Sequence, residues 1–326
     1  MRKIIKPLLL LLLPLLVVQC SKQNTPEPLS LQNPRKYTDE YYANLRAYKK
    51  TDHQLCFGWY ADYSQTYSYG QHFMGLPDSI DIISLWGGIP DKTTEPGTYD
   101  EMRFCQQVKG MKMVVPIIVE LESSGFPVDD EGLKQYTNML VDMVLDNDLD
   151  GLDMDWEPRS GTYLASASNF AKMVEYASER LGPKSGTDKL LIVDYYNHTL
   201  PTTIEPFLNY VVNQAYTQGT TSNSGTNLQT RYDRVSSWCP PNKFIVTENI
   251  GDWWQNGGSP FTEVGGNTVS PVDGQRMYSL EGMARWQPRQ GTKAGFGAFY
   301  FGRDYNSNPP YKYMRRAIQV ANPAVH

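Results

Sequence analysis

The sequence contains few cysteines, and their positions suit neither a disulfide framework nor a zinc site. Four cysteines occur in 326 residues, and three of them, Cys56, Cys105 and Cys239, lie beyond the N-terminal segment. Three thiols allow at most one disulfide. No spacing among the cysteines and the four histidines resembles a zinc motif, and no glycine loop of the phosphate-cradling kind occurs. We therefore expect no metal and no cofactor.

Positive charge is also scarce, which argues against nucleic acid as a partner. The chain has 30 lysines and arginines against 35 aspartates and glutamates, for a formal net charge of −5. Three of the positive charges, Arg2, Lys3 and Lys6, belong to the N-terminal segment, so the rest of the chain is more acidic still. Binding to nucleic acid depends on neutralising phosphates with basic residues, and this chain offers no basic excess.

Long apolar runs are missing except at the N-terminus, where Leu8 to Val18 follow a basic start. That run is short for a membrane span and is typical of an export signal. The cysteine directly after it resembles the bacterial lipoprotein pattern, with Cys20 as the lipid-bearing residue, although Gln19 stands where a small residue is usual. This predicts a signal peptide at 1–19, a polar tether at 20–34, a folded domain at 35–326, and an outer-membrane lipoprotein facing the periplasm or the exterior.

The most informative stretch is "DLDGLDMDWEPRSG", from Asp148 to Gly161. Side chains alternate between the two faces of a strand, so Asp153, Asp155 and Glu157 share one face and three apolar residues share the other. Like charges raise one another's pKa, and we expect at least one of these groups to hold a proton near neutral pH, as a general acid requires. A solvated acidic turn is the alternative, but turn residues do not flank the run.

Eight segments have the composition of buried strands, and helical patterns at 131–147 and 165–182 separate some of them. The strand segments are 56–60, 80–89, 112–121, the acidic run ending at Glu157, 189–197, 209–216, 243–250 and 295–302. Eight strands with intervening helices favour a single (β/α)8 barrel of the α/β class. A doubly wound open sheet is the second possibility, which the missing glycine fingerprint disfavours.

Active sites of such barrels lie at the carboxyl ends of the strands, where this sequence is rich in aromatic, amide and acidic side chains. Aromatic faces stack on sugar rings and polar groups bind hydroxyls, so the clustering indicates a saccharide. The candidate substrate-binding residues are Trp59, Trp86, Glu120, Tyr195, Asn197, Glu248, Trp253 and Tyr300.

The segment from Asp150 to Glu157 resembles the DGxDxDxE signature of family 18 glycoside hydrolases, which that family carries on its fourth barrel strand. The resemblance implies a substrate-assisted retaining mechanism, an exception to the usual two-carboxylate scheme. In this mechanism Glu157 protonates the glycosidic oxygen and the 2-acetamido group of the substrate attacks the anomeric carbon. Asp155 would hold the acetamido N–H, and Asp153 beneath it would share a proton. Asp150, which is out of phase, would be structural.

The resemblance also implies a role for Tyr216 at the end of the sixth strand, as a donor to the acetamido oxygen. Gln214, two residues earlier, resembles the endo-β-N-acetylglucosaminidases of the family, including those of Bacteroidetes glycan-utilisation systems, which cut N-glycan cores. Trp156 gives the opposite indication, because chitinases often have that residue. We therefore expect a monomer that acts on an N-acetylglucosamine-containing glycan or glycoprotein. A chitinase-like endohydrolase and a non-catalytic glycan-binding barrel are the alternatives.

Overall fold

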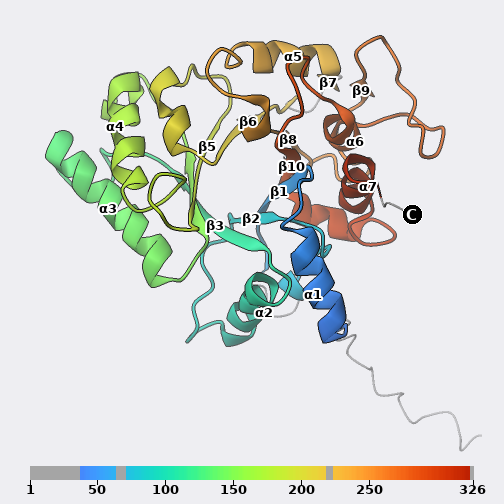
Figure 1. Ribbon diagram of the computed structural model, residues 1–326, viewed down its shortest axis with the longest axis horizontal. Coiled ribbons are helices and arrows are strands. Elements are labelled where there is room, and N and C mark those ends of the chain that lie inside the picture. Colours follow the sequence, from blue (N-terminus) through green and yellow to red (C-terminus); the bar gives the residue numbers. More distant parts are fainter. Residues whose placement is uncertain (1–36, 64–70, 218–222, 324–326) are drawn as a thin grey trace, which may run out of the picture. The chain divides into compact units, whose positions relative to one another are not determined.

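The computed structural model describes residues 37–63, 71–217 and 223–323, and the unit that begins at Thr38 contains a closed barrel of eight parallel strands (Figure 1). Neighbours around the barrel follow the order β1-β10-β8-β6-β5-β4-β3-β2. The barrel strands are β1 (Leu55–Tyr60), β2 (Ile82–Leu85), β3 (Lys112–Ile118), β4 (Gly151–Asp155), β5 (Leu190–Tyr195), β6 (Tyr210–Gln214), β8 (Phe244–Asn249) and β10 (Gly295–Phe299). Each overlaps one of the eight predicted segments, which confirms the (β/α)8 barrel.

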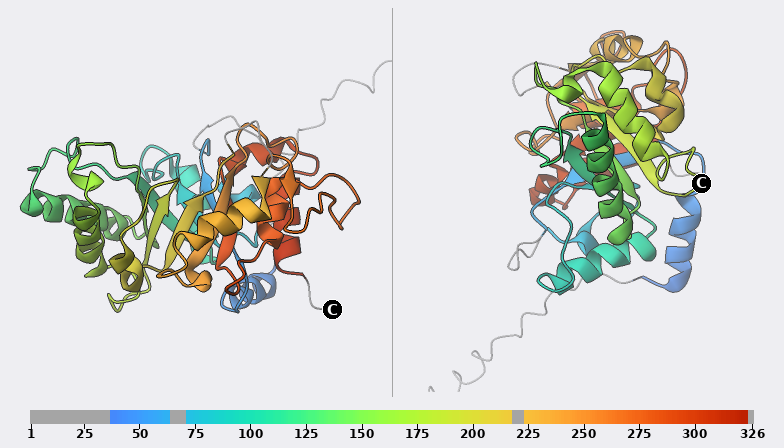
Figure 2. Two further views of the ribbon diagram at one scale, coloured as in Figure 1. Left: turned by 90° about the horizontal axis from the view of Figure 1, so that it is seen from above. Right: turned by 90° about the vertical axis from the view of Figure 1, so that its left-hand side faces the viewer.

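Helices surround the strands, but they do not follow every strand. The α-helices are α1 (Asp39–Tyr48), α2 (Pro96–Gln107), α3 (Asp130–Asp146), α4 (Ala167–Ser178), α5 (Gly225–Asp233), α6 (Ser279–Arg285) and α7 (Lys312–Ala321). Between β5 and β6 the connection is the 3₁₀ helix Thr202–Phe207, where Pro201 and Pro206 disfavour α-helical hydrogen bonding. Figure 2 shows the helices arranged around the outside of the strands. A separate pair of short strands, β7 (Asn223–Ser224) and β9 (Phe261–Thr262), lies beside α5 and α6.

The alternation predicted for the acidic run is present in β4. Leu152 and Met154 are fully buried in the outer hydrophobic cluster, between the strands and the surrounding helices. Trp156 also faces outward, where its ring stacks on Phe170 of α4 at a centroid separation of 4.7 Å. A second, smaller cluster fills the inside of the barrel. The apolar outer face therefore anchors β4 against its helices, and the opposite face of the strand is left for the carboxylates.

The cysteines of the barrel unit are buried free thiols. Burial raises the pKa of Cys105 and of Cys239 to about 12, and it raises the pKa of the Cys56 thiol well above its usual range. A thiol that stays protonated is a poor nucleophile and a poor metal ligand. These residues serve as small apolar packing groups. In the described residues, no helix is both long enough and apolar enough to cross a membrane.

Asp150, the first acidic residue of the signature, joins strands and helix on the outside of the barrel. Its Oδ2 accepts hydrogen bonds from the backbone N–H of Met113 and from the side-chain amide of Gln106, each at 2.8 Å. Its Oδ1 lies 3.0 Å from Nζ of Lys112. The carboxylate thus ties the start of β4 to β3 and α2, as expected for a structural role.

We predict that Asp150→Ala destabilises the protein and leaves the chemistry intact. The change leaves the buried N–H of Met113 without an acceptor, which is typically worth about 1–3 kcal/mol of unfolding free energy. Chemical denaturation monitored by circular dichroism measures this loss, with Asp188→Ala as the control because Asp188 is exposed. Unchanged stability in Asp150→Ala, or a specific loss of kcat in folded protein, would contradict the structural assignment.

Candidate active site

The last three carboxylates of the signature lie toward the carboxyl end of β4, at increasing distance from the barrel interior. Asp153 is fully buried and Asp155 is 4% exposed, and both point inward from β4. Glu157 is the second residue after the end of the strand and is exposed at the surface. The alternation therefore produces a graded set, with two inner carboxyl groups and one outer group that substrate can reach.

Asp153 is held from below by two donors. The indole N–H of Trp59 on β1 donates to its Oδ2 at 3.0 Å, and the hydroxyl of Ser84 on β2 donates to the same atom at 2.7 Å. Trp59 is only 2% exposed and its ring packs on Phe57. The prediction of Trp59 as a sugar-stacking residue is corrected accordingly, because its ring lies in the floor under the carboxylates.

A third buried carboxyl group, which the sequence analysis did not single out, belongs to Asp194 on β5. Asp194 is paired in register with Asp155 on the neighbouring strand, and it is fully buried. The side-chain amide of Gln214 donates to both residues, at 3.1 Å to Asp155 and 2.5 Å to Asp194. Gln214 thus joins three strands of the barrel through one amide nitrogen. The sequence did contain a signal for Asp194, because this residue stands two positions after Ile192 and therefore faces the inside of the barrel on the same strand.

Hydrogen bonding among these groups requires a proton. Oδ1 of Asp153 and Oδ2 of Asp194 are both buried, and no protein donor reaches either atom within the described residues. The two carboxyl groups lie within hydrogen-bonding reach of each other, so a single proton between them satisfies both oxygens. The expected retention of a proton therefore has a geometric basis, with Asp194 as an additional participant.

All three buried carboxyl groups have pKa values above those of ordinary aspartates. Burial raises the pKa of Asp153 to about 6. Burial, followed by the charges of Glu157 and Asp153, raises the pKa of Asp155 to about 7. Burial and the neighbouring carboxylates also raise the pKa of Asp194. At neutral pH the cluster therefore holds at least one proton, because full ionisation would place three negative charges in one desolvated space.

Aromatic rings form the wall beside the carboxylates. The ring of Tyr216, just beyond β6, lies 6.0 Å from Phe299 and 6.3 Å from Tyr196. Phe299 also contacts Trp86 edge to face at 5.3 Å. Burial and the charges of Asp194 and Asp155 raise the pKa of Tyr216 well above its usual value. Its hydroxyl therefore remains a hydrogen-bond donor, and Phe299, which the sequence analysis missed, connects it to Trp86.

Two predicted substrate contacts point away from this site. Tyr195 packs in the outer hydrophobic cluster and is 4% exposed. Glu248 is paired in register with Ala298, which also faces outward, and its carboxylate accepts from the N–H of Asn249 at 2.9 Å and the hydroxyl of Ser259 at 3.2 Å. Both predictions are corrected, because the strand alternation directs these side chains outward to the barrel's exterior.

The other predicted contacts lie in the loops that follow the strands. Glu120 accepts a hydrogen bond from Ser123 at 2.7 Å and forms an ion pair with Arg159. Asn197 is exposed after β5. Trp253 and Tyr300 are half-buried after β8 and β10. These residues therefore remain on the face that carries the carboxylates.

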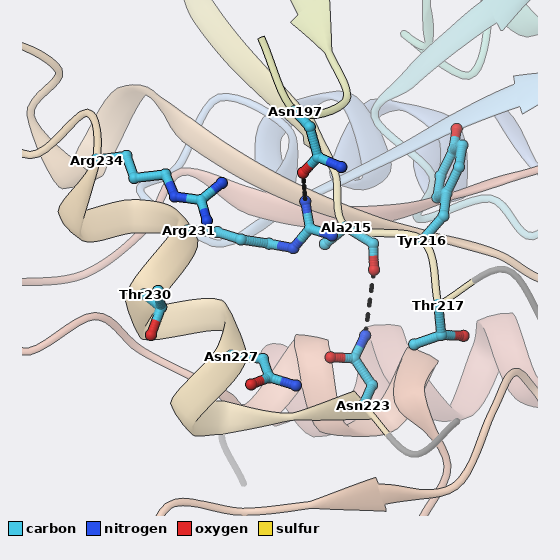
Figure 3. Close-up of a pocket in the computed structure, with 9 residues that line it drawn as sticks. All are labelled: Asn197, Ala215, Tyr216, Thr217, Asn223, Asn227, Thr230, Arg231 and Arg234. Atoms are coloured by element: carbon cyan, nitrogen blue, oxygen red, sulfur yellow. Dashed lines mark hydrogen bonds between the residues drawn. The ribbon is translucent and has the colours of Figure 1, made fainter. Parts of the chain in front are cut away.

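A pocket of about 270 Å³ adjoins Tyr216 (Figure 3). It lies between the ends of β5 and β6 and helix α5, and its walls are mostly polar. The lining residues are Asn197, Ala215, Tyr216, Thr217, Asn223, Asn227, Thr230, Arg231 and Arg234. The combination of a carboxylate centre, an aromatic wall and a neighbouring polar pocket suits a sugar chain longer than one residue.

Comparisons with known proteins agree with this geometry. The family model described as the TIM-barrel domain of endo-beta-N-acetylglucosaminidase EndoS matches residues 43–298. Endo-beta-N-acetylglucosaminidase F2 of Elizabethkingia meningoseptica is 27% identical over 305 residues, covering 86% of this chain and 85% of that protein.

Solved structures also resemble this barrel closely. A glutamate-to-glutamine variant of BT1044 superimposes with a TM-score of 0.73 at 25% identity, covering 90% of this chain and 97% of that one. An endo-beta-N-acetylglucosaminidase from Cordyceps militaris, solved with fucosyl-N-acetylglucosamine-Asn, gives a TM-score of 0.66 at 23% identity and covers 89% and 98% of the two chains. The second likeness concerns the fold alone.

We predict that Asp155→Asn flattens the fall of stability with rising pH. The pKa of Asp155 is about 7 in the folded protein against an ordinary value of 3.8, so the folded state binds more protons between these values and stability decreases as pH rises through that window. The asparagine does not titrate in this window, so the decrease in unfolding free energy with pH should become less steep by up to about 1.36 kcal/mol per pH unit. Unfolding free energies measured from pH 4 to pH 8 test this, with the exposed Asp188→Asn as control. Equal slopes in Asp155→Asn and wild type would exclude the raised pKa.

Proposed function

This chain belongs to the family of endo-β-N-acetylglucosaminidase TIM-barrel domains, and on that premise we propose that it cleaves the GlcNAc-β1,4-GlcNAc linkage in N-glycan cores. It is an endo-acting glycoside hydrolase, as its relatives indicate. The assignment to family 18 and to the mannosyl-glycoprotein type is part of the proposal. The observation that carries it is the hydrogen-bonded set of Asp153, Asp194, Gln214 and Asp155 beneath an exposed Glu157.

Glu157 is the proposed general acid. It stands at the open mouth of the barrel, where a side chain can reach the glycosidic oxygen of a bound glycan. Donating a proton to that oxygen allows the bond to the anomeric carbon to break. After the oxazolinium intermediate has formed, the same carboxylate accepts a proton from the water that opens it. This double use follows from the retaining, substrate-assisted scheme.

Asp155 and Tyr216 hold the acetamido group that attacks. Asp155 accepts its N–H, and the second carboxylate oxygen is fixed by the amide of Gln214. Tyr216 keeps its proton and donates to the acetamido oxygen as charge develops there. A positioned donor of this kind is typically worth about 2.7–4 kcal/mol in the transition state. Gln214 therefore acts by orienting Asp155.

The packing of Trp156 weakens the chitinase alternative. This residue gave the sequence its chitinase-like character, but its ring is 3% exposed, stacks on Phe170 and donates its N–H to the carbonyl of Leu164. A side chain held in this way contributes packing and does not select substrate. Gln214, in contrast, lies within the carboxylate cluster. The binding-only alternative is disfavoured because every side chain that the mechanism requires is present.

We predict that the purified protein releases glycans from N-glycosylated glycoproteins and leaves one GlcNAc on asparagine. High-mannose and complex glycoproteins, O-glycosylated glycoproteins and chitin oligomers form the substrate panel, and mass spectrometry identifies the products. Glu157→Gln should abolish turnover and retain glycan binding, because the amide keeps the shape of the acid but cannot donate its proton. The control Glu175→Gln changes an exposed glutamate on α4 and should retain full activity.

The panel separates the three functions. Preferential cleavage of chitin oligomers would replace N-glycans by the chitinase-like function, and binding without turnover in the wild type would favour the non-catalytic barrel. Substantial turnover in Glu157→Gln would remove that residue from its role.

We also propose that the chain is a lipoprotein anchored in the outer membrane through Cys20, with residues 20–34 as tether and 35–326 as the catalytic domain. Residues 1–36 lie outside the described part of the chain, so this proposal rests on the sequence alone. The basic start, the short apolar run and the cysteine directly after it support it. An anchored enzyme would act on glycans that reach its own membrane surface.

We predict that Cys20→Ala releases the exported protein from the membrane. Without the thiol no lipid can be attached, so metabolic labelling with a fatty acid should mark the wild type only, and the variant should appear in the soluble fraction. Cys56→Ala serves as the control because that thiol is buried in the barrel. Equal labelling of wild type and Cys20→Ala would contradict lipidation at this site.

A further inference from the structure

Two arginines, Arg231 and Arg234, line the pocket beside Tyr216, and neither forms an ion pair with a carboxylate in the part of the chain that the structure describes. Arg231 is in the last turn of α5 and Arg234 caps its C-terminus. Figure 3 shows both side chains extending from the helix toward Asn197. The acceptors of Arg231 are all neutral, and Arg234 is exposed. Because both arginines line one pocket, an oxyanion bound there would be attracted by two positive charges.

Arg231 is held in place at the edge of the pocket. Its Nη1 donates to the carbonyl of Tyr196 at 3.4 Å, to Oδ1 of Asn197 at 3.2 Å and to Oδ1 of Asn213 at 3.5 Å. The guanidinium also lies 5.5 Å from the ring centre of Tyr196. The three hydrogen bonds use one nitrogen of the guanidinium, and none of their acceptors carries a charge. A positioned, planar guanidinium with free N–H groups favours bidentate binding of an oxyanion.

The rest of the pocket suits the neutral part of a sugar. Asn227, Thr230 and Thr217 present amide and hydroxyl groups, and Asn223 is fixed by a hydrogen bond to the carbonyl of Ala215 at 3.2 Å. The volume of about 270 Å³ is just below the range of about 300–1,000 Å³ typical of drug-sized ligands, which favours one sugar residue over several. A second cavity of about 190 Å³ shares Asn197 and both arginines, so the guanidinium groups lie between the two spaces.

The position of the pocket connects it with the proposed chemistry. Tyr216 lines the pocket and also lies beside the buried carboxylates. A sugar bound there would therefore be close to the linkage that is cut. The chain has a net charge of −5, but the two arginines make this pocket locally positive beside the acidic cluster. A positive pocket favours negatively charged glycans over neutral ones.

We propose that this pocket is a subsite for an anionic sugar, one that carries a carboxylate or a sulfate ester. The inference rests on the proposed function, since it assigns a class of glycan to the same cleft. Arg231 and Arg234 bind the oxyanion, and the amides and hydroxyls bind the ring substituents. The enzyme accordingly favours charged over neutral glycans of the same branching.

Three matched glycopeptides test the subsite. They share one biantennary N-glycan, which is either neutral, or carries terminal sialic acids, or carries a sulfate ester on a sugar near the cleaved linkage. The measured quantity is the ratio of kcat/KM for each charged form to that of the neutral form. The wild type should give a ratio of roughly ten at low ionic strength for at least one charged form, decreasing as salt is added. The two charged forms distinguish a carboxylate at a branch end from a sulfate close to the cut.

Substitutions at Arg231 and Arg234 show which residue produces the preference for charged glycans. Arg234→Gln should reduce the ratio several-fold, and Arg231→Gln with Arg234→Gln should bring it to about one. Arg231→Lys should retain part of the preference, because the charge remains while the bidentate geometry is lost. The control is Arg289→Gln, since Arg289 is an exposed arginine that pairs with Asp233 outside the pocket.

The outcomes separate this inference from the proposed function. Cleavage of all three glycopeptides at equal rates, or a ratio that Arg234→Gln does not change, overturns the subsite and leaves the hydrolase intact. If no glycopeptide is cleaved, the proposed function fails and calorimetry on the Glu157→Gln protein decides the pocket. Tighter binding of a charged form, lost in Arg234→Gln, would support the subsite, and equal affinities would overturn it.

Discussion

Burying several carboxyl groups in one barrel is unfavourable unless donors and protons compensate them, and the site is organised around that requirement. Asp153, Asp155 and Asp194 lie within one desolvated space at the carboxyl end of the strands. The side-chain amide of Gln214 donates to both Asp155 and Asp194, and one proton fits between Asp194 and Asp153. Trp59 and Ser84 supply the remaining donors from below. Each partner comes from a different strand, so the closed barrel is what brings the compensation together.

The compensation has a consequence for the reaction. A carboxyl cluster that holds a proton near neutral pH can change its charge distribution as substrate binds and positive charge develops at the sugar. Asp155 is the member nearest to the mouth and the one whose pKa responds to Glu157. In the proposed mechanism the inner pair would act on the acetamido group through Asp155, while Glu157 is exposed to solvent. The buried carboxyl groups that share a proton and the proposed general acid are thus separate residues, each with its own surroundings.

Side chains on the outer face of the barrel anchor the strand that carries the inner carboxyl groups. Leu152, Met154 and Trp156 pack against the helices, and Asp150 ties β4 to β3 and α2. These contacts anchor the outer side of the strand, and its inner face carries the carboxyl groups. Glu248 plays a similar part on β8, where its buried carboxylate accepts from Thr217 at 3.4 Å and so links β8 to the segment that follows Tyr216. Acidic residues of the same chain therefore serve as structural ties outside the barrel and form the proposed catalytic cluster inside it.

The sequence by itself determined the barrel, the strand that carries the acids and the inward direction of Asp153 and Asp155, because alternation along a strand and the count of strand segments are local properties. It also indicated Tyr216 and Gln214, through their resemblance to a known pattern. It did not identify Asp194 or Phe299, and it assigned Trp59, Tyr195 and Glu248 to contacts with the substrate. Those assignments depend on which residues of neighbouring strands stand level with each other, and on which face each side chain occupies at a strand end. Alternation along each strand carried part of that information, but only closure of the barrel decided which residues stand level with each other, because register between strands is set by packing across the whole sheet.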